Sequence, residues 1–208
     1  MIVPKHKATI GKGGHMADEN SSTPLLKPER LLAFSDGMFS IIITIMVLEL
    51  KVPHSAEPAA LIELWPVLLA YVLSFIQAGI YWVNHHTLFA TAKRVDGRIL
   101  WLNLLLLFCL SLMPFATDYA GETRFAAFPT ALYAFVMLLP ALTWTPLHAA
   151  IARINPGERA ITGTAMRKGF AATGLYIAAV PLAFVHPALT LLLIFTVAVM
   201  YFLPTRYF

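Results

Sequence analysis

Long apolar segments separated by short polar ones make up the chain from about residue 31 onward. Each of the first four is close to the roughly 20 residues that a helix needs to cross a bilayer. The last apolar stretch, 169–204, is split by His186-Pro187 into two short segments of about 17 residues each, near the lower limit for a span. The pattern predicts an all-α integral membrane protein with six transmembrane helices, at Leu31–Leu50, Leu64–Val83, Ile99–Thr117 and Phe128–Ile151, with two more in 169–204.

The first 29 residues have a different composition from the rest of the chain. They are polar, rich in Gly, Ser, Lys and Pro, and they lack the apolar core of a signal peptide. We expect residues 1–29 to form a flexible cytosolic tail and residues 30–208 to form the membrane domain. The step Gly14-His15-Met16 resembles a cloning junction, so part of the tail is a candidate for vector-derived sequence.

Composition and charge agree with a membrane location. Hydrophobic residues make up 59% of the chain and charged residues only 12%, whereas soluble domains are about one quarter charged. With both termini in the cytosol, every Lys and Arg except Lys51 and Arg124 falls on the cytosolic side, as positively charged loops do. Topology therefore explains the net charge of +4, and no basic stripe with interleaved aromatic residues indicates nucleic-acid binding.

One carboxylate lies within the first apolar segment. Asp36 ends the motif Arg30-Leu-Leu-Ala-Phe-Ser-Asp36, and an unpaired charge at that depth costs at least roughly 3 kcal/mol. Arg30 is six residues away, about 9 Å along a helix, so a direct pair within one helix would be strained. We expect a network between helices or subunits, with donors from the end of the second span: Trp82, Asn84, His85 and His86.

The first span also carries a one-sided aliphatic stripe. At 100° per residue, Asp36 lies about 140° from Ile41, on a different face. The stripe itself consists of Gly37, Ile41, Thr44, Ile45 and Leu48. From the residues alone, such a stripe serves equally well as a lipid-facing surface, a helix-packing surface or the wall of a pore.

Two motifs together resemble a known family. Arg30-x-x-x-Phe34-Ser35-Asp36 on the first span and Trp82-x-x-His85-His86-x-x-Phe89 on the second resemble those of the bacterial members of the lysosomal-type potassium channel family. The resemblance implies a homotetramer in which the first helices line a central cation pore. It also implies a multi-pass location in the bacterial inner (cell) membrane.

The resemblance assigns roles to three groups of residues. The aliphatic pore wall and gate would be Ile41, Ile45 and Leu48, and the hydroxyl candidates for ion selectivity would be Ser40 and Thr44. A structural or gating network would contain Arg30, Phe34, Ser35, Asp36, Trp82, Asn84, His85 and His86.

The expected function is that of a potassium-selective or potassium-preferring cation channel. Potassium and other monovalent cations are the permeant species, and no cofactor is expected. No segment like the Thr-Val-Gly-Tyr-Gly filter of conventional potassium channels occurs, so selectivity is expected at the hydroxyl of Thr44.

Two other functional classes are weaker. A proton-coupled secondary transporter would use Asp36 with His85 and His86, but no repeat that pairs broken helices is evident. An enzyme is disfavoured because no Gly-x-Ser-x-Gly, His-Glu-x-x-His or paired-carboxylate arrangement occurs. A metal site at the histidine pair is also disfavoured, because adjacent helical positions point about 100° apart.

Overall fold

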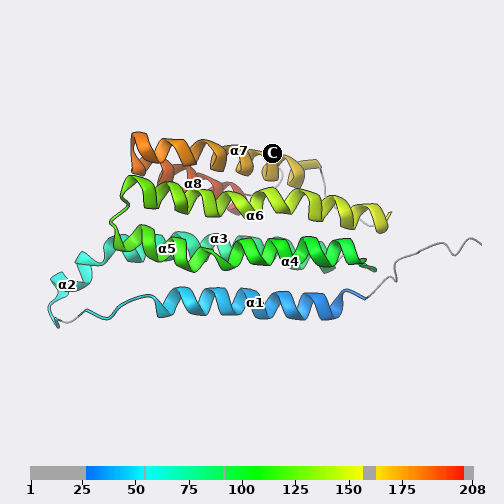
Figure 1. Cartoon of the computed structure of the whole chain (residues 1–208), viewed down its shortest axis with the longest axis horizontal. Helices are drawn as coiled ribbons and strands as arrows, with labels where there is room; N and C mark the ends of the chain where they lie inside the picture. Colours follow the sequence, from blue (N-terminus) through cyan, green and yellow to red (C-terminus); the bar gives the residue numbers. More distant parts are fainter. Residues whose placement is uncertain (1–26, 54, 91, 157–162, 204–208) are drawn as a thin grey trace, which may run out of the picture.

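A computed structural model describes residues 27–53, 55–90, 92–156 and 163–203. Apart from the short α2, its helices run along the length of an elongated bundle, with α4 and α5 end to end (Figure 1). Residues 1–26 of the predicted tail lie outside the described residues. The helices in the described part are α1 (Glu29–Leu48), α2 (Pro58–Glu63), α3 (Trp65–Ala90), α4 (Gly97–Ser111), α5 (Met113–Glu122), α6 (Ala127–Ile154), α7 (Gly163–Val185) and α8 (Pro187–Phe202).

The all-helical architecture agrees with the prediction, and the spans agree with it in part. In the described residues, five helical stretches are long and apolar enough to cross a membrane: α1, α3, α4 with α5, α6, and α7 from Met166. The sixth predicted span corresponds to α8, which is apolar but has only 16 residues. Five spans are therefore clear by length, and a sixth depends on α8.

Two predicted elements differ from the observed ones. The predicted third span is divided at Leu112 into α4 and α5, because Pro114 in the first turn of α5 has no N–H to continue the helical hydrogen-bond ladder. The second span does not end at Val83 but continues as α3 to Ala90, so the histidine pair lies inside the helix.

Prolines mark two other features of the fold. α6 runs unbroken through Pro140 and Pro146, as expected for a spanning helix whose neighbours satisfy the freed carbonyls. The predicted break before Pro187 is observed, with His186 extended and its Nδ1 accepting a hydrogen bond from the N–H of Ala188 at 3.2 Å.

The arrangement of the layers places α1 on one flank. α1 packs against α3, α4 and α5, and α7 lies at the opposite flank beyond α6 (Figure 1). α8 packs against α7, α6 and α3, and among the described residues it has no main contact with α1. α3 and α5 approach so closely that a Cβ on Gly121 would lie 2.8 Å from Cα of Val67. Glycine at this position therefore permits the close backbone contact between α3 and α5, two of the helices on which α1 packs.

Candidate functional site

α1 has one buried and one exposed face. Its buried side chains repeat at spacings of three and four residues and point into the bundle: Leu31, Ser35, Phe39, Ile42 and Met46. The other face of the helix carries the predicted pore residues, with exposed fractions of 54% for Ile41, 40% for Ile45 and 75% for Leu48. Phe34 is also on the exposed side, at 52%. The subunit leaves this aliphatic face uncovered.

The two predicted selectivity residues are also exposed on α1. The hydroxyl of Ser40 donates to the carbonyl of Asp36 at 3.0 Å, and that of Thr44 donates to the carbonyl of Ser40 at 2.7 Å. Each hydroxyl hydrogen is therefore used within the helix, and the oxygen lone pairs remain available. An oxygen in this state can accept a hydrogen bond or coordinate a cation.

Trp82 supplies a donor to Asp36. Its indole Nε1 donates to Oδ1 of Asp36 at 3.0 Å and thus joins α3 to α1. The ring of His86 lies against the indole, with centroids 5.8 Å apart, and both side chains are exposed. The carboxylate of Asp36 is therefore held at the surface of the subunit.

A second contact between helices lies in the interior. The hydroxyl of Ser35 donates to the carbonyl of Leu31 at 2.9 Å and accepts from Nδ2 of Asn103 at 2.9 Å. Oδ1 of Asn103 is 2.7 Å from Nε2 of His85. Since Nδ2 is the donor to Ser35, Oδ1 must accept, and His85 carries its hydrogen on Nε2. This buried chain connects α1, α4 and α3.

Aromatic rings surround His85. The ring of Phe39 on α1 meets it edge-on at 5.6 Å, and the ring of Phe89 lies 4.6 Å away along α3. Nδ1 of His85 is buried and has no hydrogen-bond partner among the described residues. The imidazole is therefore fixed on one side by Asn103 and packed against apolar rings elsewhere.

Asn103 is the residue that sequence reasoning did not include in the network. It is 1% exposed and joins two predicted members, Ser35 and His85, that do not bond each other directly. The available signal was a single amide within the apolar run of α4. A single amide does not identify its partners, because it can form hydrogen bonds with any neighbouring helix.

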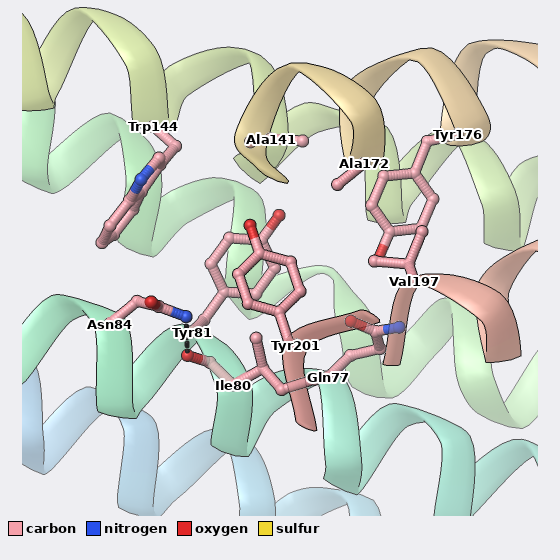
Figure 2. Close-up of a pocket in the computed structure, with 11 residues that line it drawn as sticks. Gln77, Ile80, Tyr81, Asn84, Ala141, Trp144, Ala172, Tyr176, Val197 and Tyr201 are labelled. Atoms are coloured by element: carbon pink, nitrogen blue, oxygen red, sulfur yellow. Dashed lines mark hydrogen bonds between the residues drawn. The ribbon is translucent and has the colours of Figure 1, made fainter. Parts of the chain in front are cut away.

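Three other predicted members lie apart. Arg30 and Phe34 are exposed at the start of α1, and no hydrogen bond or ion pair joins Arg30 to another described residue. Asn84 donates to the carbonyl of Ile80 at 2.7 Å within its own helix. It lines a pocket between α3, α6, α7 and α8, together with Tyr81, Trp144 and other side chains (Figure 2). Asn84 is therefore outside the contacts between α1 and its neighbours.

An ion pair ties the far end of α1 to α5. Nζ of Lys51 lies 3.1 Å from Oε1 of Glu122, and this hydrogen bond raises the pKa of the Lys51 ammonium above its ordinary value. Lys51 is therefore positively charged at neutral pH. Within the described residues, no group of three or more His, Cys, Asp or Glu side chains is arranged to hold a metal ion.

Known proteins are similar to this chain in both sequence and fold. Residues 30–114 match the family model described as the endosomal/lysosomal potassium channel TMEM175. A Chryseobacterium protein named as a potassium channel is 43% identical over 180 residues, which are 85% of this chain and 93% of that protein. The chain belongs to the TMEM175 family.

Further relatives extend the likeness of this TMEM175 family member. A potassium channel of Streptomyces collinus is 39% identical over 78% of this chain and 85% of that protein. The crystal structure of a lysosomal potassium-selective channel TMEM175 homolog from Chamaesiphon minutus matches with a TM-score of 0.71 and 31% identity. The match covers 86% of this chain and 97% of that one, so the all-helical membrane-channel fold is shared over nearly the whole length.

Proposed function

We propose that this chain is the subunit of a homotetrameric potassium-selective or potassium-preferring channel whose α1 helices line the pore. The uncovered aliphatic face of α1, with Ile41, Ile45 and Leu48, is the observation that carries the proposal. One helix cannot enclose a pore, so these faces must meet around an axis shared by several subunits. Potassium is proposed as the permeant ion because the relatives are named as potassium channels.

The aliphatic residues form the constriction. Rings of Ile41, Ile45 and Leu48 make a narrow apolar passage, and such a passage closes to ions when it loses its water. The side chains on the opposite side of α1 fit tightly into the bundle, with Phe39, Ile42 and Met46 each 2% exposed. The tightly packed buried face of α1 holds the helix rigidly as a pore wall.

The hydroxyls on α1 give the ion preference. Thr44 Oγ1 uses its hydrogen in the bond to Ser40, so four copies present oxygen atoms to the axis. A ring of such oxygens replaces part of the hydration shell of a potassium ion. Ser40, one turn nearer the start of the helix, acts in the same way.

The side chains behind α1 anchor it. Trp82 holds Asp36, while Asn103 joins Ser35 to His85. Opening and closing require α1 to move relative to α3 and α4, so these contacts are the ones that set the gating equilibrium. His86 supports the indole of Trp82, and Arg30 and Phe34 face neighbouring subunits.

Six spans with both termini in the cytosol complete the proposal. The end of the bundle where α1 begins is basic in its described residues, whereas Glu49, Glu63 and Glu122 lie at the other end. Cytosolic loops carry the excess of Lys and Arg, so the basic end is the cytosolic one. α8 crosses as the sixth span, and the protein resides in the bacterial inner membrane.

Single-channel recording in a planar bilayer tests the proposal. In symmetric potassium we expect unitary current steps that vary linearly with voltage. Ile41→Ala widens the apolar ring and should raise the unitary conductance severalfold. Thr196→Ala, an exposed position on α8, is the matched control and should leave the conductance unchanged.

Two outcomes would overturn the proposal. Proton-linked flux without unitary steps would indicate the proton-coupled transporter based on Asp36, His85 and His86. Unitary steps of unchanged size in Ile41→Ala would place the constriction elsewhere.

A further inference from the structure

α4 has an outward face that neither the pore nor the anchoring contacts use. Arg98, Trp101, Leu105 and Phe108 are all exposed, and at 100° per residue they fall within about 80° of one another. Of the three apolar side chains, Trp101 is the most exposed, at 75%, and Phe108 is 59% exposed. This α4 ridge is therefore an apolar strip with a basic residue at its end.

Additional basic residues are held next to that end. Asn155, which follows α6, accepts hydrogen bonds at Oδ1 from the backbone N–H groups of Lys93 and Arg94, at 2.9 and 3.1 Å. Its Nδ2 donates to the carbonyl of Arg94 at 3.1 Å. Asn155 is buried, and these three hydrogen bonds hold the loop before α4 against the end of α6, where Arg153 lies.

The charge at this corner is strongly positive. Arg94, Arg98 and Arg153 are exposed. In the described residues of the α3–α4 loop, the first turn of α4 and the last turn of α6, the only carboxylate is Asp96. Asp96 already caps α4 through the N–H of Ile99 at 2.9 Å, and the α4 dipole adds positive potential at its start.

The position of Trp101 indicates where this surface lies relative to the lipid headgroups of the membrane. It lies one turn from Arg98, at the change from the charged end of α4 to its apolar length. Tryptophan indoles concentrate at the level of lipid headgroups, and basic corners between spanning helices attract anionic headgroups. A ligand that matches both parts has an anionic phosphate next to an acyl chain.

We propose that the α4 ridge and its basic corner bind an anionic phospholipid. Arg94, Arg98 and Arg153 hold the phosphate, since guanidinium groups form paired hydrogen bonds with its oxygens. The acyl chain lies along Trp101, Leu105 and Phe108. This is a lipid site on the outside of the subunit, and it does not depend on the ion that the pore conducts.

Native mass spectrometry of the full-length protein in detergent tests the site. The protein is titrated with phosphatidylglycerol and, separately, with phosphatidylcholine of the same acyl chains. We expect the anionic lipid to bind more tightly, and each of Arg98→Gln and Arg153→Gln to weaken it about fivefold, the effect of one basic residue near an anionic surface. Trp101→Ala should weaken both lipids.

Matched controls decide the source and place of binding. Arg124→Gln removes an exposed arginine from the opposite end of the bundle and should leave phosphatidylglycerol binding unchanged. Equal binding of the two lipids, or an equal loss in Arg124→Gln, would overturn the proposal. Displacement of the lipid by millimolar inorganic phosphate would overturn it in favour of a free anion. A changed subunit count in Trp101→Ala would instead assign the ridge to a second copy of the chain.

Discussion

At the residue scale, the neighbouring side chains of Ser35 and Asp36 have different surroundings. Asp36 is bonded at the surface by Trp82, while Ser35 takes part in a buried chain through Asn103 to His85. The sequence motif indicated that this stretch must find donors, and the end of the second span was the predicted source. It did not indicate Asn103, because the partner of an amide depends on which helix lies beside it.

Replacing Asn103 tests the buried chain. Asn103→Leu leaves the hydroxyl of Ser35 without its donor and the Nε2–H of His85 without its acceptor. The unmet groups should lower the unfolding free energy by about 1–3 kcal/mol, measured as a lower melting temperature in detergent. Ser111→Ala is the control, because its exposed hydroxyl bonds only the carbonyl of Phe108 in its own helix. Equal shifts in the two variants would contradict the assigned role.

Thr44 tests ion preference at the same scale. Thr44→Ala removes the oxygen that we propose faces the axis, so the potassium-to-sodium permeability ratio should fall. The ratio follows from reversal potentials under bi-ionic conditions. Thr44→Ser keeps the oxygen and should retain most of the preference. An unchanged ratio in Thr44→Ala would eliminate this oxygen as the source of selectivity.

At the element scale, the effect of a proline on a helix differs from one span to another. Pro114 divides the third predicted span, whereas Pro140 and Pro146 leave α6 continuous. The sequence alone does not separate these cases, since the outcome depends on whether neighbouring groups satisfy the freed carbonyls. The short α2 was not predicted, because its six residues have no apolar period to identify them.

Gly121 provides a test of helix packing. Gly121→Ala places a Cβ 2.8 Å from the backbone of Val67, and α3 and α5 must separate to admit it. We expect a loss of about 1–3 kcal/mol in unfolding free energy. Gly174→Ala is the matched control, because no atom lies within 4 Å of its added Cβ and alanine favours the helix. A variant of Gly121 that melts at the wild-type temperature would contradict the close approach.

At the scale of the whole molecule, the subunit is asymmetric in both shape and charge. α1 occupies one flank with its aliphatic face uncovered, and α7 occupies the other (Figure 1). A family member with this arrangement needs further subunits to surround an ion path. The proposed pore therefore requires the tetramer, and a result that excludes the tetramer also excludes this pore.

The mass of the assembly tests this. The chain has a mass of 23.0 kDa, so light scattering in detergent should give a protein mass about four times that value. Ile45→Cys should form cross-links between subunits on oxidation if α1 faces the shared axis. Leu192→Cys, on the exposed side of α8, is the control and should not cross-link. A monomeric mass without cross-links would exclude a pore lined by α1.

The sequence by itself determined the features that depend on local composition. Apolar length indicated an all-helical membrane protein, the break before Pro187 separated α7 from α8, and the paired motifs on the first two spans indicated the family. It also identified the aliphatic stripe of α1, because helical periodicity fixes which side chains share a face.

Tertiary structure decided what each face meets. The periodicity of α1 is the same whether Ile41 or Ile42 points inward, and only packing against α3, α4 and α5 buries Ile42 and leaves Ile41 exposed. The link from Ser35 to His85 required the side chain of Asn103 on α4 to reach both α1 and α3. Contacts between distant segments depend on how helices pack in three dimensions, and local sequence does not encode that packing one residue at a time.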